Sequence, residues 1–280
     1  MGRFERLTLR RPDPWLAAPA GALLALGLLM ALDTTYFLGQ EKTGDGFHYF
    51  KLHLIHIAAG AAVCLVLSQF SRAGLRRLAR PLALVALAML IMVWMPGLAV
   101  TRGGARRWVR LGPILAEPSE LVKFGLVFFL AAFLAKREER IESFAGGPLP
   151  AFAVVAPLAL MTLKQPDFGA TVMIVLILLV MLFAAGARLR HLALGGGGAL
   201  AVLTLLAVAK PYRLRRFAGF MDPWRTAGDA GFQLIQSFIA LGAGGLWGQG
   251  LGGGRQKLFY LPAAHTDFVF AVVTEDLGLT

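Results

Sequence analysis

Charged residues are scarce in this chain of 280 residues, and acidic residues are the scarcest. Only 16% of the residues are charged, whereas a soluble domain usually carries about 25%. The 28 basic residues outnumber the 16 acidic ones and give a net charge of +12. The single cysteine, Cys64, excludes an intramolecular disulfide. The shortage of charge, together with 57% hydrophobic residues, excludes an ordinary soluble domain.

The hydrophobic residues come in long blocks. Residues 15–32, 81–100 and 168–187 are runs of 18, 20 and 20 residues without a charge. About 20 apolar residues cross the hydrocarbon core of a bilayer, where the backbone must satisfy its own hydrogen bonds. We therefore predict an all-α, polytopic integral membrane protein. Its seven spans and the start of an eighth are expected at residues 15–38, 52–70, 81–100, 119–135, 149–164, 168–187, 192–209 and from 266.

We expect a single membrane domain over residues 1–280. Residues 1–209 hold the seven spans, 210–265 form a long outer loop, and 266–280 open an eighth span that is too short to cross. The density of basic residues in short loops places the N-terminus inside, with the four arginines of residues 3–11 on the cytoplasmic side. Basic residues between spans favour anionic lipid over nucleic acid as the partner. The short last span indicates a fragment.

Two outer segments are basic, against that trend. Their basic residues are Arg102, Arg106, Arg107 and Arg110 in one, and Lys210, Arg213, Arg215, Arg216, Arg225, Arg255 and Lys257 in the other. One interpretation is a set of solvated or lipid-headgroup contacts. The other is a site for an anionic ligand, with phosphate as the natural partner of arginine forks.

Two predicted helix starts carry polar residues at the membrane boundary. Pro118 and Glu120 mark the start of the fourth span, and Glu120 shares a helix face with Lys123. This pair is either a local ion pair or part of a ligand path, because an intramembrane lysine is costly. Asp167, in the turn before the sixth span, either caps that helix or holds a basic loop or a cation in place.

The last apolar segment opens with His265, Thr266 and Asp267. Asp267 either caps the eighth helix or acts as a general base at the outer membrane surface. Upstream, residues 248–253 match G-x-G-x-x-G, but no strand precedes them. Tight backbone turns therefore explain these glycines better than a bound dinucleotide. Residues 232–241 predict an amphipathic helix on the protein or in the interface.

Together these segments resemble the FtsW/RodA/SpoVE family. The matching motifs are Gly104-Ala105-x-Arg107-Trp108, Pro118-Ser119-Glu120-Leu121-x-Lys123, Pro166-Asp167-Phe168-Gly169, Gly228-x-x-Gly231-Phe232-Gln233 and His265-Thr266-Asp267-Phe268. Two further segments, at 222–224 and 256–262, look more like the division branch, FtsW, than the elongation branch, RodA. The family usually has Gln at position 117 and Glu at positions 263 and 276. Its members have about ten spans, so the last two or three fall beyond Thr280.

The resemblance implies a peptidoglycan glycosyltransferase with lipid II as both donor and acceptor. It maps the essential acid of the family onto Asp267, as the base that deprotonates the attacking hydroxyl. The reaction inverts the anomeric carbon and releases undecaprenyl pyrophosphate, whose charge Arg107 and Lys123 are the first candidates to stabilise. The other substrate-binding residues implied are Glu120, Asp167, Arg213, Arg215, Arg216, His265 and Lys257.

The resemblance also implies a metal cofactor, protein partners and a cellular location. A divalent cation, Mg²⁺ or Mn²⁺, could share the charge of the leaving group, and no organic cofactor is expected. His53 and His56 have the spacing of a metal pair but lack a third ligand nearby, so the metal residues stay open. The expected partners are a class B penicillin-binding protein, which is a transpeptidase, and other divisome membrane proteins. The expected place is the bacterial cytoplasmic membrane at the division septum.

Two other functions compete with the polymerase. A flippase would move the same lipid-linked precursor through broken fifth and sixth helices, and it would leave Asp267 dispensable. A scaffold would dock a partner without chemistry, which explains the long outer loop but not the polar residues at membrane depth.

Overall fold

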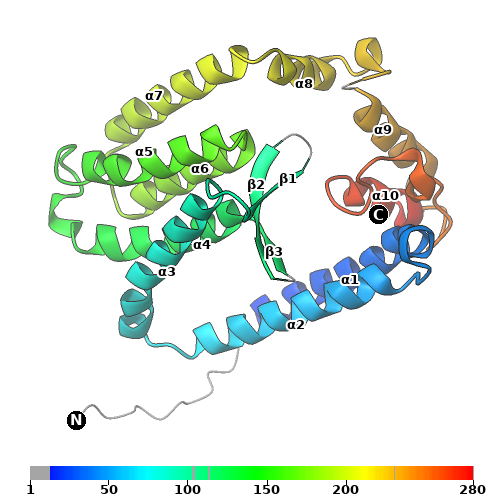
Figure 1. Ribbon diagram of the computed structural model, residues 1–280, viewed down its shortest axis with the longest axis horizontal. Helices are drawn as coiled ribbons and strands as arrows, with labels where there is room; N and C mark the ends of the chain where they lie inside the picture. The colour runs from blue at the N-terminus through cyan, green and yellow to red at the C-terminus, as the bar shows by residue number, and fades with distance from the viewer. Residues whose placement is uncertain (1–12, 103–104, 113, 230, 280) are drawn as a thin grey trace. The chain divides into compact units, whose positions relative to one another are not determined.

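The computed structural model describes residues 13–102, 105–112, 114–229 and 231–279. The chain forms two compact units, one of the residues up to Gln69 and from Lys210 on, and the other of Phe70–Ala209. Helices dominate both units (Figure 1). The arginines of residues 3–11, which support the predicted orientation, and Gly104 of the first family motif lie outside the described residues.

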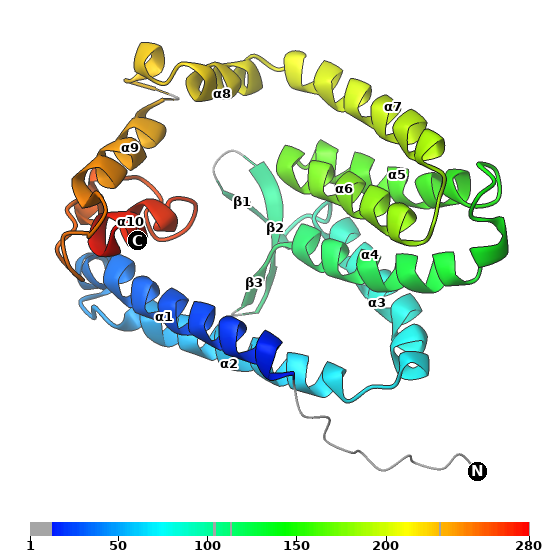
Figure 2. The ribbon, with the colours of Figure 1, turned by 180° about the vertical axis from the view of Figure 1, so that it is seen from behind.

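The first unit is built on two long helices. α1 (Pro14–Thr43) and α2 (His48–Ser68) pack along each other (Figure 1, Figure 2). Asp13 caps the start of α1 by accepting a hydrogen bond from the Trp15 N–H at 2.9 Å. Gly44 ends the helix in the left-handed conformation that glycine adopts without strain. Most apolar side chains of both helices are exposed, as expected for helices that face lipid.

The residues from Lys210 on add shorter helices to this unit. These are α8 (Pro211–Met221), the 3-10 helix η2 (Trp224–Thr226), α9 (Phe232–Gly244), the π-helical turn η3 (Gln256–Tyr260) and α10 (Val269–Leu277). α10 packs against both α9 and α1. The small core between them consists of Met30, Ala240, Leu261, Ala264, Ala271 and Val272. The segment predicted as a loop at 210–265 is therefore largely folded, and the helix predicted at 232–241 is confirmed as α9.

The second unit contains a bundle of helices. They are α3 (Arg72–Met92), α4 (Pro118–Ala135), the 3-10 helix η1 (Glu138–Arg140), α5 (Pro148–Lys164), α6 (Phe168–Ala184) and α7 (Leu189–Val208). α4 packs against α3 and α6, and α5 packs against α6. Two rows of apolar side chains, each with its members four residues apart, meet in the core. They are Val122, Leu126, Leu130 and Leu134 on α4, and Ile174, Leu178 and Leu182 on α6.

The second unit also holds a three-stranded antiparallel sheet that the sequence analysis did not predict. β1 (Ala99–Arg102) pairs with β2 (Ala105–Leu111), and β2 pairs with β3 (Ile114–Ala116). The strands are short and rich in arginine, so their sequence is hard to tell from a polar loop. The register of β1 and β2 shifts between Val100 and Thr101, so Arg107 is an extra residue of β2 with no partner residue in β1.

Within the described residues, four helices are long and apolar enough to cross a membrane, namely α1, α2, α4 and α7. α5 and α6 have 17 residues each and rise about 26 Å, slightly less than the roughly 30 Å of a hydrocarbon core. Six of the predicted spans coincide with α1, α2, α4, α5, α6 and α7, with boundaries that differ by a few residues.

The span predicted at 81–100 is wrong at both ends. α3 begins nine residues earlier, at Arg72, and continues through Pro81. It ends at Met92, because the chain then turns at Gly97, whose φ is +83°, and enters β1.

Close packing of α9 against α10 depends on Gly244. A Cβ at Gly244 would collide with the backbone carbonyl of Thr274, whereas a Cβ at Gly242 on the same helix would meet nothing within 4 Å. We expect Gly244→Ala to lower the free energy of unfolding by about 1–3 kcal/mol, and Gly242→Ala to leave it unchanged or slightly higher. Thermal unfolding in detergent measures both variants. Equal midpoints would contradict this packing of the two helices.

Candidate functional site

A polar cluster in the second unit joins β2 to the starts of α4 and α6. The guanidinium of Arg107 lies 3.5 Å from Glu117 (Nε to Oε1) and 3.9 Å from Asp167 (Nη1 to Oδ1). Both distances exceed the hydrogen-bond range of about 2.7–3.2 Å, so these are ion pairs without hydrogen bonds. Its Nε is buried and has no hydrogen-bond partner among the described residues, whereas the side chain as a whole is 37% exposed. The exposed part of the side chain can still face an anionic ligand.

Asp167 is buried and has several partners. Its Oδ1 accepts a hydrogen bond from the Ala170 N–H at 3.0 Å and so caps α6, which confirms the capping interpretation. Its Oδ2 accepts a hydrogen bond from the Ser119 hydroxyl at 3.2 Å. The same carboxylate faces Arg107, so it also holds a residue of the basic segment that was predicted to lie outside, as the second interpretation expected.

Glu117 is a member of this cluster that the sequence analysis treated only as a departure from the family. It stands directly before α4, with its carboxylate beside Arg107. Burial raises the pKa of Glu117, the positive charge of Arg107 opposes that rise, and the negative charge of Asp167 adds to it. An acid in place of the neutral glutamine, next to an arginine-rich segment, was the signal that could have identified it.

Glu120 and Lys123 form the local ion pair that their spacing predicts. The Lys123 ammonium donates to Glu120 Oε1 at 2.7 Å, at the start of α4. Glu120 is exposed and Lys123 is half-buried. Their part in a ligand path remains a prediction.

Asp267 lies on a turn of the first unit, directly before α10. Its side chain is exposed. The residue at the start of α10 is Phe268, and no side chain caps the helix. The interpretation of Asp267 as a helix cap is therefore wrong. The turn is closed instead by the backbone, because the N–H groups of Thr266 and Phe268 both donate to the Ala263 carbonyl, at 3.0 and 3.3 Å.

His265 stands two residues before Asp267. Partial burial and the nearby charge of Lys42 lower the pKa of His265, while Asp267 opposes the shift. Because the ordinary pKa of histidine is about 6.5, the imidazole is mostly neutral at pH 7.

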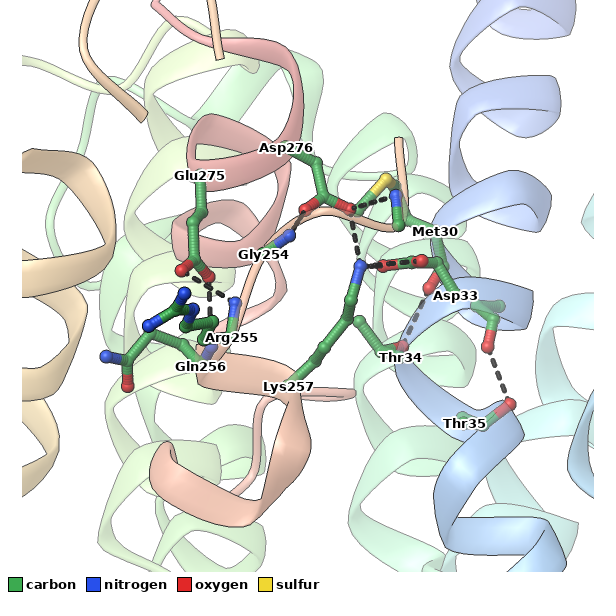
Figure 3. Close-up of polar contacts among 12 residues, drawn as sticks. Met30, Asp33, Thr34, Thr35, Gly254, Arg255, Gln256, Lys257, Glu275 and Asp276 are labelled. Atoms are coloured by element: carbon green, nitrogen blue, oxygen red, sulfur yellow. Dashed lines mark hydrogen bonds and ion pairs between the residues drawn. The ribbon is translucent and has the colours of Figure 1, made fainter. Parts of the chain in front are cut away.

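Lys257 lies at the centre of a second polar cluster (Figure 3). Its ammonium donates to both oxygens of Asp33 at 2.7 Å and to Asp276 Oδ2 at 2.8 Å, and its side chain is 1% exposed. All three N–H donors of the ammonium are used. The prediction that Lys257 binds substrate does not fit this arrangement, since no donor is left for a ligand. A basic residue in a predicted outer loop looks solvated in sequence, and only the fold buries it.

Asp33 was not among the site residues predicted from the sequence. It follows the first charge-free run directly and lies inside α1. An acidic residue within an apolar helix is a signal for a buried partner, and that partner is Lys257.

Three further residues of the long segment that were predicted to bind substrate, namely Arg213, Arg215 and Arg216, lie on α8. Arg215 and Arg216 are exposed, and Arg213 is half-buried with its guanidinium 6.0 Å from the ring centre of Tyr212. Their binding of substrate remains a prediction. In the part of the chain that the structure describes, no group of three or more His, Cys, Asp or Glu side chains is arranged to hold a metal ion. The described side chains thus do not provide a complete site for a divalent cation.

Comparison with known proteins connects these features to one family. The model of the FtsW/RodA/SpoVE family, described as cell cycle protein, matches residues 15–280. The chain is 42% identical to a probable peptidoglycan glycosyltransferase FtsW of Coxiella burnetii, over 95% of this chain and 72% of the relative. It is 38% identical to the protein of the same name from Geobacter sulfurreducens, over 97% of this chain and 73% of the relative.

Solved structures agree in fold. One similar chain comes from a study of structural coordination of polymerization and crosslinking by a peptidoglycan synthase complex, with a TM-score of 0.70 and 31% identity. The match covers 95% of this chain and 71% of the other. The rod shape determining protein RodA of Thermus thermophilus matches with a TM-score of 0.51 and 27% identity, over 69% of this chain and 59% of that one.

Two substitutions separate the roles of Asp167. Asparagine caps helices as well as aspartate does, so Asp167→Asn keeps the cap on α6 but removes the charge that faces Arg107. We expect Asp167→Ala to lower the free energy of unfolding by about 1–2 kcal/mol, and Asp167→Asn to lower it much less. Thermal unfolding in detergent compares the two. If asparagine destabilises as much as alanine, the charge and not the cap is the main contribution of Asp167.

Proposed function

The chain belongs to the FtsW/RodA/SpoVE family, and we propose that it is a multi-pass membrane peptidoglycan glycosyltransferase of the cell-division branch that polymerises lipid II. The names of its relatives support the enzyme class and the branch. Lipid II as donor and acceptor is our inference from the same resemblance.

The observation that carries the catalytic assignment is the position of Asp267. Its carboxylate is exposed on a turn and caps no helix. Stability of the fold therefore does not explain an acid at this position. A carboxylate that is open to solvent can meet a substrate hydroxyl and accept its proton.

The chemistry follows from the needs of glycosyl transfer. A sugar hydroxyl is a weak nucleophile, so Asp267 takes its proton as the oxygen attacks the anomeric carbon of the donor. The bond from that carbon to the pyrophosphate oxygen breaks with inversion, and undecaprenyl pyrophosphate leaves with the bonding electrons. Fixed positive charge stabilises the leaving group. We assign this role first to Arg107 on β2 and Lys123 in α4, and next to Arg213, Arg215 and Arg216 on α8.

We further propose a cation, a partner and a location. Mg²⁺ or Mn²⁺ would bind with the pyrophosphate of the substrate, because the described side chains do not complete a site. The partner would be a class B penicillin-binding protein, and one similar structure belongs to a peptidoglycan synthase complex. The enzyme would act at the outer face of the cytoplasmic membrane at the septum, with a cytoplasmic N-terminus.

Asp267→Asn tests the base directly. We expect the variant to lose about 10²–10⁴-fold in polymerisation rate, because an amide cannot accept the proton of the hydroxyl. The assay uses the complete protein with its synthase partner and fluorescent lipid II, and it follows glycan ladders on a gel. Asp229→Asn is the matched control, since Asp229 is another exposed aspartate of the first unit, and it should polymerise at the wild-type rate.

Persistent ladders from Asp267→Asn would remove Asp267 as the base. Absence of ladders from every protein, with lipid II crossing the membrane of proteoliposomes, would instead support the flippase. Addition of EDTA followed by Mg²⁺ or Mn²⁺ to the same assay tests the cation, and unchanged ladders in EDTA would contradict it.

Arg107→Gln tests stabilisation of the leaving group. We expect its polymerisation rate to fall by about 10²-fold, as for the loss of one preorganised donor. Arg110→Gln is the matched control, because Arg110 is an exposed arginine of the same strand, and it should change the rate by less than about threefold. Equal rates for the two variants would show that β2 contributes only general positive charge.

A further inference from the structure

A buried clamp holds the segment before the Asp267 turn against the end of α10. Backbone N–H groups of residues 252–256 donate to the adjacent carboxylates of Glu275 and Asp276, at 2.7–3.2 Å (Figure 3). The donors are Gly252 and Gly254 to Asp276, and Arg255 and Gln256 to Glu275. Glu275 is 2% exposed and Asp276 is 1% exposed. Two consecutive buried acids thus use most of their acceptor capacity on one stretch of backbone.

Glycine makes this close approach possible. Gly248, Gly250 and Gly252 all have a positive φ, between +74° and +90°, which other residues rarely adopt. A Cβ on Gly254 would collide with the carboxylate of Asp276. The expectation that these glycines allow tight backbone turns is confirmed, and the group that they approach is the end of α10.

Lys257 completes the clamp by adding α1. Its ammonium joins Asp33 on α1 to Asp276 on α10. These hydrogen bonds involve the carboxylates of Asp33, Glu275 and Asp276 and the Lys257 ammonium. Without the ammonium, the buried carboxylate of Asp276 and the half-buried carboxylate of Asp33 would face each other as like charges. Lys257 therefore connects three segments that are far apart in the sequence.

Residues 258–274 connect Lys257, at one end of the clamp, to Glu275, at the other end. Leu261, Ala264 and Ala271 anchor the segment in the small core of the first unit. Asp267 lies outside that core and is exposed. The place of its carboxylate consequently depends on how the two ends of the segment are held.

We propose that Lys257 is a positioning residue for Asp267. It does not touch the substrate, since its donors are used within the protein, and it acts by fixing the clamp that sets the Asp267 turn. This inference rests on the proposed function of Asp267 as the base. Displacement of a catalytic group by about 1 Å can cost 10²-fold in rate, so loosening the clamp should slow the chemical step without weakening the binding of lipid II.

The test uses the complete protein with its synthase partner and measures kcat and KM for lipid II. Lys257→Met removes the ammonium and should lower kcat by about 10–10²-fold at unchanged KM. This variant leaves the carboxylates of Asp33 and Asp276 without their cation and can fail to fold. The double variant Asp33→Leu with Lys257→Met removes one of these carboxylates together with the ammonium, while Asp276 keeps the backbone N–H donors of Gly252 and Gly254. It should unfold at a higher temperature than Lys257→Met and still show the low kcat.

The outcomes separate the possibilities. Recovery of wild-type kcat in the double variant would mean that Lys257 only balances charge, and a rise in KM at unchanged kcat would make it a substrate ligand. Either result overturns the positioning role. Lys51→Met, which removes an exposed lysine–aspartate pair of the same unit, should leave kcat unchanged. If Asp267→Asn is as active as wild type in the same assay, the proposed base fails instead, independently of Lys257.

Discussion

The hydrogen bonds of the Lys257 ammonium to Asp33 and Asp276 are the interaction on which the first unit depends. Removing one partner from such a buried ion pair typically costs about 3–5 kcal/mol, which is a large share of the 5–15 kcal/mol that usually stabilises a domain. Lys257 joins Asp33 on α1 to Asp276 on α10. Asp276 and its neighbour Glu275 also accept hydrogen bonds from the glycine-rich backbone. The apolar core of this unit is small, so polar contacts define where the Asp267 turn lies.

In the second unit, too, a buried charged side chain needs polar partners, and here it is Asp167. Asp167 is buried, and a backbone N–H, the Ser119 hydroxyl and the Arg107 guanidinium offset the loss of water around its carboxylate. One carboxylate thereby caps α6, contacts the first turn of α4 and faces β2. Here the rows of apolar side chains on α4 and α6 supply most of the packing, while the carboxylate orients an arginine whose exposed part can face an anionic ligand.

Much of this architecture is visible in the sequence, because the features concerned are local. Charge-free runs locate the helices, and the spacing of Glu120 and Lys123 predicts their ion pair. The sheet of residues 99–116 was missed since three-residue to seven-residue strands rich in arginine carry little periodicity. Burial of Lys257 and the absence of a cap at Asp267 depend on contacts between distant segments, and neither can be read from composition. Asp33 was visible as an acid in an apolar helix.

In the proposed mechanism Asp267 contacts the acceptor hydroxyl, while Lys257 stays away from the substrate. An experimental structure of the complete protein with its partner and an unreactive lipid II analogue tests this most directly. We predict the Asp267 carboxylate within about 2.6–3.2 Å of the acceptor hydroxyl, with the ammonium of Lys257 still bound to Asp33 and Asp276. An acceptor hydroxyl against another base, with Asp267 remote from both sugars, would contradict the account.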